Sequence, residues 1–170
     1  MLYYARDKVD VARITGWIRA MINDGGRYKE DAYAVAVVGK NGLNEIYAAM
    51  AFFDYSGTDV FVEGAIDKPS VCRMNDFEDA IGVPFRNPLN VLRVTALVKS
   101  ANKRSFNILT KLGFKKEGEI RNYLQEGCNG FVLGLTRQDW EDRYGKQRWR
   151  RKRPATSDTG RNVCGASGIQ

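Results

Sequence analysis

The sequence predicts one α/β (α+β) domain with mainly antiparallel strands, followed by a basic tail. A helical pattern opens the chain, three strand-like runs joined by turn residues follow it, and a strand, a helix and a hairpin close the folded part. With 170 residues, the chain fits a single domain with a substantial core. We therefore expect a folded domain over residues 1–145 and a disordered tail over residues 146–170.

The first predicted element is an amphipathic helix. Val11, Ile14 and Ile18 recur at the spacing of one helix face, and the pair Gly25-Gly26 is expected to end the helix. Three strand-like runs come next, over residues 33–38, 46–55 and 60–66. Asn41-Gly42 between the first two runs is a hairpin signal, because both residue types tolerate positive φ. The three runs therefore predict an antiparallel meander.

The second half of the domain predicts alternating helices and strands. We expect a helix over residues 74–83, a strand over 92–98, a helix over 102–112 and hairpin strands over 115–124 and 130–136. Pro84 and Pro88 end the first helix, since proline cannot continue the backbone hydrogen bonds. Gly113 supplies the left-handed position that commonly closes a helix.

Composition excludes several kinds of site. The chain has no histidine, which rules out Ser-His and Cys-His nucleophile pairs and leaves Glu, Asp, Lys, Tyr or water for proton transfer. Cys72, Cys128 and Cys164 are odd in number and far apart, so they predict neither a disulfide framework nor a zinc site. We expect no metal.

The net charge of +7 is concentrated at the C-terminus, where residues 146–170 carry +6 of it. Residues 146–153 hold most of this charge together with Trp149. This segment either binds nucleic acid or an acidic partner, or is simply a solvated low-complexity end. The folded part is nearly neutral, so a plain nucleic-acid-binding domain is not expected.

Neither a membrane span nor a secretory signal is expected. No apolar run approaches the roughly 20 residues of a membrane-spanning helix. The N-terminus lacks a basic region followed by an apolar stretch. A cytoplasmic protein is therefore the expectation.

The most specific signal lies between Leu92 and Trp140. It comprises Arg93-Val94-Thr95, Asn102, Ser105, Lys111-Leu112-Gly113-Phe114, Glu117-Gly118, Arg121 and Leu135-Thr136-Arg137-Gln138-Asp139-Trp140. This order and spacing resembles the GNAT superfamily of acyl-CoA N-acyltransferases. It looks closest to the branch that acetylates ribosomal proteins and protein N-termini, and to GNAT-like proteins of tailed phages. The resemblance covers about residues 8–145.

The resemblance implies a fold and an activity. The sheet is expected to splay between the strands at 60–66 and 92–98, with helices on both faces, and Gly64 is expected to mark a bulge that opens it. Acetyl-CoA would be the co-substrate. Its acetyl group would pass by direct attack to an amine, which is a protein N-terminus, a lysine or a small molecule. If the protein is phage-encoded, it would act in the host cytoplasm or reside in the virion.

The resemblance also implies site residues. Glu63 would be the general base and Ser105 would lie near the thioester sulfur. Cofactor contacts would come from Ile66, Lys68, Ser70, Val71, Cys72, Arg73 and Asn102. Taken alone, these residues allow plainer readings: Glu63 as an outward-facing carboxylate, Asn102 as a helix cap and Ser105 as an ordinary helix residue.

One segment departs from the family pattern. GNAT enzymes typically carry Arg/Gln-x-x-Gly-x-Gly/Ala where this chain has Lys68-Pro69-Ser70-Val71-Cys72-Arg73, with no glycine to let backbone amides close around the pyrophosphate. The tyrosine that many members use as general acid is replaced by Leu109. The alternative function is therefore a GNAT fold without catalysis, serving as a virion-associated or nucleic-acid-binding module through its tail.

Overall fold

The structure is a computed structural model that describes residues 1–22, 32–86 and 88–145. The strands are β1 (Leu2–Tyr4), β2 (Tyr33–Gly39), β3 (Gly42–Phe53), β4 (Asp59–Ile66), β5 (Arg93–Lys99), β6 (Lys115–Ile120) and β7 (Gly130–Thr136). The helices are α1 (Lys8–Ile22), α2 (Met74–Ile81), α3 (Lys103–Lys111) and α4 (Arg137–Tyr144), with a 3-10 turn η1 (Pro69–Val71).

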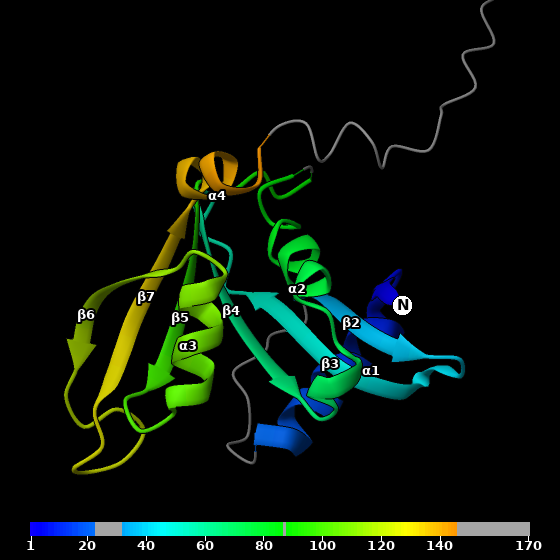
Figure 1. Ribbon diagram of the computed structural model, residues 1–170, viewed down its shortest axis with the longest axis horizontal. Coiled ribbons are helices and arrows are strands. Elements are labelled where there is room, and N and C mark those ends of the chain that lie inside the picture. Colours follow the sequence, from blue (N-terminus) through cyan, green and yellow to red (C-terminus); the bar gives the residue numbers. More distant parts are fainter. Residues whose placement is uncertain (23–31, 87, 146–170) are drawn as a thin grey trace, which may run out of the picture.

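All the strands of the described residues form one sheet in the order β1-β2-β3-β4-β5-β7-β6 (Figure 1). Every neighbouring pair is antiparallel except β4 and β5, which are parallel. The parallel pair needs a crossover, which α2 provides between the two strands. The predicted mixed, mainly antiparallel sheet is confirmed.

Helix α1 covers one face of the sheet. Ile14 and Ile18 are fully buried and pack against small residues of β2 and β3, including Ala36 and Ala51. The helix begins where the Asp7 carboxylate accepts a hydrogen bond from the Asp10 amide at 2.9 Å, which satisfies one of the free donors of the first turn.

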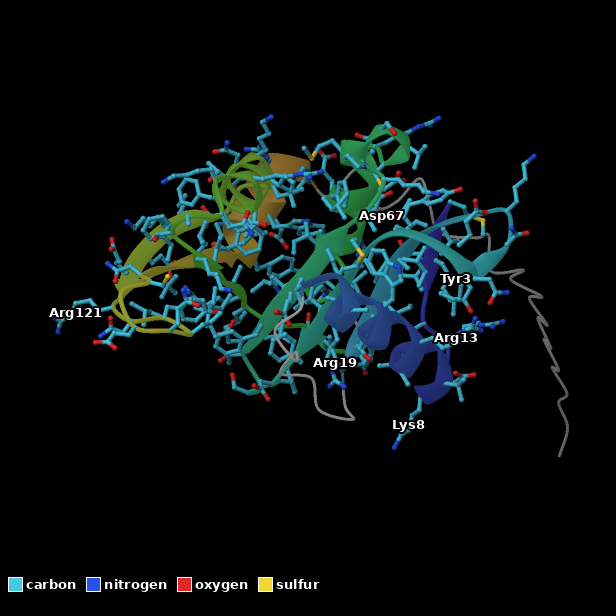
Figure 2. The ribbon with its side chains drawn as sticks, turned by 90° about the horizontal axis from the view of Figure 1, so that it is seen from below. Tyr3, Lys8, Arg13, Arg19, Asp67 and Arg121 are labelled. Atoms are coloured by element: carbon cyan, nitrogen blue, oxygen red, sulfur yellow. The ribbon has the colours of Figure 1, made fainter. Side chains whose placement is uncertain are left out.

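Helices α2, α3 and α4 lie against the other face and build the larger core (Figure 2). Its centre contains Ile81, Leu112 and Leu133, all fully buried. Phe85 stacks on Trp140 of α4, with ring centroids 5.4 Å apart. Helices on both faces of the sheet are therefore confirmed.

The hairpin between β2 and β3 turns at Gly42, which has a φ of +59°. This agrees with the Asn-Gly signal, but β3 begins at Gly42 rather than at residue 46. The start of β3 is polar and half-exposed, so it lacks the apolar run that marks a buried strand.

The bulge expected at Gly64 is absent. The β3–β4 ladder runs through Met50↔Gly64 and Ala51↔Glu63 without a register shift. A Cβ at Gly64 would lie 2.7 Å from the Ala49 carbonyl oxygen, so glycine is required there by close packing against β3. The prediction of a bulge was wrong for this reason.

Two elements were not predicted from the sequence. Strand β1 is only three residues long and pairs with β2 through Leu2↔Val37 to Tyr4↔Val35. Helix α4 is capped by Thr136, whose hydroxyl accepts a hydrogen bond from the Asp139 amide at 3.1 Å. A Thr followed three residues later by an acid is a helix-start signal that identifies α4 in retrospect.

Some expectations fall outside the described residues. They are the end of the first helix at Gly25-Gly26 and the basic tail at 146–170. Within the described ranges, no helix combines the length and the apolar composition needed to cross a membrane.

We predict that Leu133→Ala lowers the free energy of unfolding by about 2–5 kcal/mol, because Leu133 is fully buried in the larger core and its removal leaves a cavity. Leu92→Ala is the matched control, since the Leu92 side chain is 56% exposed. Urea denaturation of both variants provides the measurement. Equal losses would contradict the assignment of Leu133 to the centre of the core.

Candidate active site

The two central strands separate part-way along their length. β4 and β5 pair only from Asp59↔Arg93 to Val62↔Ala96, although β4 continues to Ile66 and β5 to Lys99. Figure 1 shows the two strands diverging toward their C-terminal ends. The predicted splay between residues 60–66 and 92–98 is therefore confirmed. Because the ladder stops, the backbone edges beyond Val62 and Ala96 line an open space instead of bonding each other.

A cavity of about 430 Å³, here called the splay cavity, fills this space. The parted ends of β4 and β5 form its walls, α2 and α3 contribute side chains, and the last residues of α1 reach it from the far side of the sheet. Of the predicted site residues, Glu63, Ile66, Asn102 and Ser105 line it. The structure thus brings residues from β4, α3 and its cap to one place.

A second cavity of about 120 Å³, here called the side cavity, adjoins the first. The two share Val62, Glu63, Leu97, Tyr123 and Leu124. Glu63 is half-buried and lines both spaces, and one of its carboxylate oxygens, Oε2, is itself buried. A carboxylate residue that lines two adjoining cavities lies within reach of groups in either of them.

Asn102 caps α3. Its side-chain oxygen accepts a hydrogen bond from the Ser105 amide at 3.0 Å. The cap reading is therefore confirmed, and because Asn102 also lines the splay cavity, a contact to a bound ligand is compatible with it. Ser105 is half-buried on the first turn of α3 and lines the same cavity.

The remaining predicted cofactor residues follow β4 but are not among the described lining residues of the splay cavity. They are Lys68, Ser70, Val71, Cys72 and Arg73. Their segment folds into η1, where the amides of Val71 and Cys72 donate to the carbonyls of Lys68 and Pro69 at 3.2 and 3.3 Å. The Lys68 amide donates to the Tyr47 carbonyl at 3.2 Å.

At the start of α2, a side chain of the helix itself also bonds a backbone amide. The Arg73 amide donates to the Asp76 carboxylate at 3.2 Å, so a negative charge already lies where an anion would approach the helix. Pro69 has no amide hydrogen. These contacts occupy the amides of residues 71–73, so those three amides do not form the free backbone cradle that GNAT enzymes offer to a pyrophosphate.

Burial raises the pKa of the Cys72 thiol on the same segment. The Sγ atom lies 3.3 Å from the Lys68 carbonyl oxygen, and desolvation, with a smaller contribution from Asp76, raises the pKa of the thiol. A thiol with a raised pKa stays protonated at neutral pH and is a poor nucleophile.

Several residues that line the splay cavity were not predicted from the sequence. Lys99 at the end of β5 and Arg104 in the first turn of α3 bring positive charge to the splay cavity. Tyr123 and Leu124 reach it from the connection between β6 and β7. The feature that marks this connection is its backbone conformation, since Asn122 and Leu124 have φ values of +53° and +68°. Such values are uncommon for residues other than glycine and are not visible in the sequence.

A polar network braces the paired end of β4 and β5. Arg93 donates to Glu117 at 2.9 Å and to Thr95 at 2.9 Å, and the buried Thr95 hydroxyl donates to Asp59 at 2.8 Å. The hydrogen bonds from Arg93 lower the pKa of Glu117, and those to Glu117 raise the pKa of Arg93. Arg93, Thr95 and Glu117, which belong to the motif between Leu92 and Trp140, thus join β4, β5 and β6.

No protein-family model matches the sequence, and no curated protein is similar enough in sequence to count as a match. Solved structures do match. The ribosomal-protein-S5-alanine acetyltransferase from Vibrio fischeri is 17% identical over 82% of this chain and 93% of its own, with a TM-score of 0.59. The chain has the GNAT fold.

Two further structures agree with this result. A putative phosphinothricin N-acetyltransferase is 15% identical over 80% of this chain and 97% of its own, with a TM-score of 0.58. A mutant of the spermidine N-acetyltransferase SpeG from Vibrio cholerae is 12% identical over 85% of this chain and 97% of its own, with a TM-score of 0.63. At these identities the likeness concerns the fold.

Metal ligands do not gather in the described part of the chain. No group of three or more His, Cys, Asp or Glu residues there is placed to hold a metal ion.

We predict that Asn102→Ala destabilises the protein by about 1 kcal/mol through loss of the α3 cap, whereas Asn102→Asp keeps a cap and most of that stability. Thr136→Ala, which removes the cap of α4, is the control for a loss of stability away from the cavities. Thermal unfolding of the three variants checks the stabilities. If Asn102→Ala unfolds like the unchanged protein, the cap contributes nothing and its place beside the cavity is its main role.

Proposed function

We propose that this protein transfers an acetyl group from acetyl-CoA to an amine. The observation that carries the proposal is the junction of the splay cavity with the side cavity at Glu63. The splay accommodates the narrow thioester-bearing arm of acetyl-CoA between β4 and β5, and the side cavity admits the acceptor. The GNAT fold of the chain supports this assignment.

The chemistry needs few groups. The amine nitrogen attacks the thioester carbonyl, a C–N bond forms and the C–S bond breaks, without a covalent bond to the protein. Glu63, directly or through a water, accepts the proton that nitrogen loses. Ser105 donates a hydrogen bond or a proton to the departing thiolate, and solvent restores the Ser105 proton. The products are the amide and free CoA, so protons and electrons balance.

The acetyl-CoA phosphates must be held differently from the usual backbone cradle, because the amides of residues 71–73 are already bonded. We propose that side-chain charge replaces it. Lys99 and Arg104 line the splay cavity, and Lys68 and Arg73 are exposed beside the end of β4. Binding through cationic side chains is more sensitive to salt than binding through buried amides.

Direct binding tests the proposed function. Calorimetric titration of the full chain with acetyl-CoA should give saturable binding in the micromolar range, with about one site per chain. Absence of binding at millimolar acetyl-CoA would overturn the proposal.

We predict that Glu63→Gln lowers turnover about a hundredfold while leaving the affinity for acetyl-CoA unchanged, as expected when a general base is removed. Steady-state rates and calorimetry give the two readouts. Glu119→Gln is the control, since Glu119 lies on β6 and lines neither cavity. An unchanged rate for Glu63→Gln would exclude this carboxylate from the mechanism.

We predict that the double variant Lys99→Ala/Arg104→Ala weakens acetyl-CoA binding about tenfold or more but hardly changes the binding of acetyl-pantetheine, which lacks the nucleotide phosphates. Lys111→Ala is the control, because Lys111 is an exposed cation of the same helix outside the cavity. The affinity of the unchanged protein should also fall as salt rises. Equal losses for both ligands would show that these cations do not serve the phosphates.

The closed segment after β4 also favours a second candidate function. A GNAT fold without a pyrophosphate cradle would serve as a binding module, with the basic residues 146–153 as its contact to nucleic acid or an acidic partner. The acetyl-CoA titration separates the two functions, since a module of this kind requires no acetyl-CoA.

A further inference from the structure

Charge is unevenly distributed along the folded part of the chain. Residues 1–145 are nearly neutral as a whole, yet the sequence between Asp79 and Glu117 contains eight lysines or arginines and no acidic residue. Acidic residues before and after this stretch balance its charge. A stretch of one charge sign forms a binding surface only where the fold gathers its side chains on one face. Helix α3 provides such a face.

The cations of α3 differ from those of β6, the strand that follows it. Lys115 of β6 lies 2.6 Å from the Asp139 carboxylate. Lys116 lies 3.2 Å from the Glu119 carboxylate. Helix α3 has no acidic residue of its own, and within the described ranges its exposed cations form no ion pair. They are Lys103, Arg104 and Lys111. Their charge is therefore available to a partner.

The exposed cations lie along one side of the helix. Lys103 and Lys111 are separated by a rise of about 12 Å, with the exposed Asn107 and Thr110 between them. At the C-terminal end, Arg143 of α4 donates to the Lys111 carbonyl at 2.6 Å and adds its own charge. Figure 1 shows α4 above this end of α3. The surface, here called the α3 face, consists of Lys103, Arg104, Asn107, Thr110, Lys111 and Arg143.

Two of these cations lie where the helix itself disfavours them. Lys103 and Arg104 are the first two residues of α3, and its first turn contains no acid. The free amides of a first turn carry a partial positive charge, which repels cations and attracts anions. The helix would be more stable with an acid at either position. Cations at this end therefore indicate a role other than stabilising α3, and a bound anion would relieve their repulsion.

The chemistry of the α3 face favours a polyphosphate over a protein surface. Its exposed side chains are all basic or polar, whereas the aromatic and aliphatic residues of α3 are half-buried and pack against the larger core. Protein interfaces depend on aromatic and apolar anchors, but contacts to a nucleic-acid backbone need only cations and hydrogen-bond donors. A DNA strand carries a phosphate about every 3.4 Å along the helix axis, so about 12 Å of α3 can meet three or four of them.

The most basic segment of the sequence is attached next to this face. The Tyr144 hydroxyl donates to the Leu112 carbonyl at 3.0 Å, which holds the end of α4 beside the end of α3. Residues 146–153 follow almost directly in the sequence and contain six lysines or arginines. The charge of this segment therefore begins where the α3 face ends.

We propose that the α3 face binds the phosphate backbone of nucleic acid without regard to base sequence, with residues 146–153 as an additional source of charge. The inference goes beyond the tail contact considered above, because it places a contact on the folded domain. It does not depend on acetyl transfer. Arg104 also lines the splay cavity, so the tests below leave it unchanged and remove only cations outside both cavities.

Binding of the full chain to a fluorescein-labelled DNA duplex of about 20 base pairs provides the test, with fluorescence anisotropy measured over a range of salt concentrations. The triple variant Lys103→Gln/Lys111→Gln/Arg143→Gln should bind the duplex about tenfold more weakly at low salt. The slope of log affinity against log salt should become shallower by about 0.9 for each cation that contacts a phosphate. A second duplex of unrelated sequence should bind equally well.

The matched control is Lys8→Gln/Arg13→Gln/Lys40→Gln, which removes the same charge from exposed positions on the other half of the sheet. Figure 2 shows Lys8 and Arg13 projecting from α1, which covers the opposite face of the sheet from α3. The control should retain most of the affinity for the duplex, because its cations lie away from the α3 face.

Lys103→Glu separates binding from stability. An acid in the first turn suits the helix dipole, so thermal unfolding should show a variant at least as stable as the unchanged protein. The same variant should bind the duplex at least about fivefold more weakly, since a repulsive charge replaces an attractive one. Undiminished duplex binding by this folded variant would overturn the inference.

Three further outcomes would also overturn it. Equal losses of duplex affinity in the triple variant and its control would show an effect of net charge alone. Polyglutamate that binds as tightly as the duplex, and is lost in the same triple variant, would show a surface for an acidic protein. A comparable loss of acetyl-CoA affinity in the triple variant would assign the face to the cofactor. If acetyl-CoA fails to bind the unchanged protein while the duplex binds as expected, the proposed function falls and the nucleic-acid surface stands.

Discussion

The site depends on one parallel pairing that ends early. β4 and β5 share backbone hydrogen bonds only up to Val62 and Ala96, after which each strand continues alone. A full-length ladder would bring the two backbones to the usual interstrand spacing of about 4.8 Å and leave no room for a ligand. Both cavities, and the position of Glu63 between them, exist because that ladder stops.

The segment after β4 shows how a binding element can keep its place and change its chemistry. In typical GNAT enzymes the start of the helix after this strand offers free amides to phosphate. Here Pro69, the turn η1 and the Asp76 carboxylate use or remove those donors. In the proposed function, recognition of a phosphate at this edge comes from side chains, whose charge acts over a longer range but with looser geometry.

The sequence predicts the order of most elements well, because their signals are local. The apolar spacing of α1, the Asn-Gly hairpin and the Asn102 cap each depend on a few neighbouring residues. β1 escaped prediction because its three residues gain their stability from pairing with β2, far along the chain. Gly64 was misread because its reason is the nearby Ala49 carbonyl on β3, which no local pattern reveals.

The candidate site was predictable only in part for the same reason. Glu63, Ile66, Asn102 and Ser105 were expected to lie together, and they do line one cavity. Asp54, Tyr123 and Leu124 come from connections between strands, where the sequence carries no periodicity. Their positions depend on backbone conformation and on how the sheet brings those connections together.

The network of Arg93, Thr95, Asp59 and Glu117 lies at the closed end of the splay, opposite the opening. The sheet is continuous from β1 to β4 on one side of this point and from β5 through β7 to β6 on the other, and the strand ladder between the two halves is four residues long. The network therefore adds side-chain hydrogen bonds and an ion pair to a short backbone ladder, and so strengthens the strand pairing that joins the two halves.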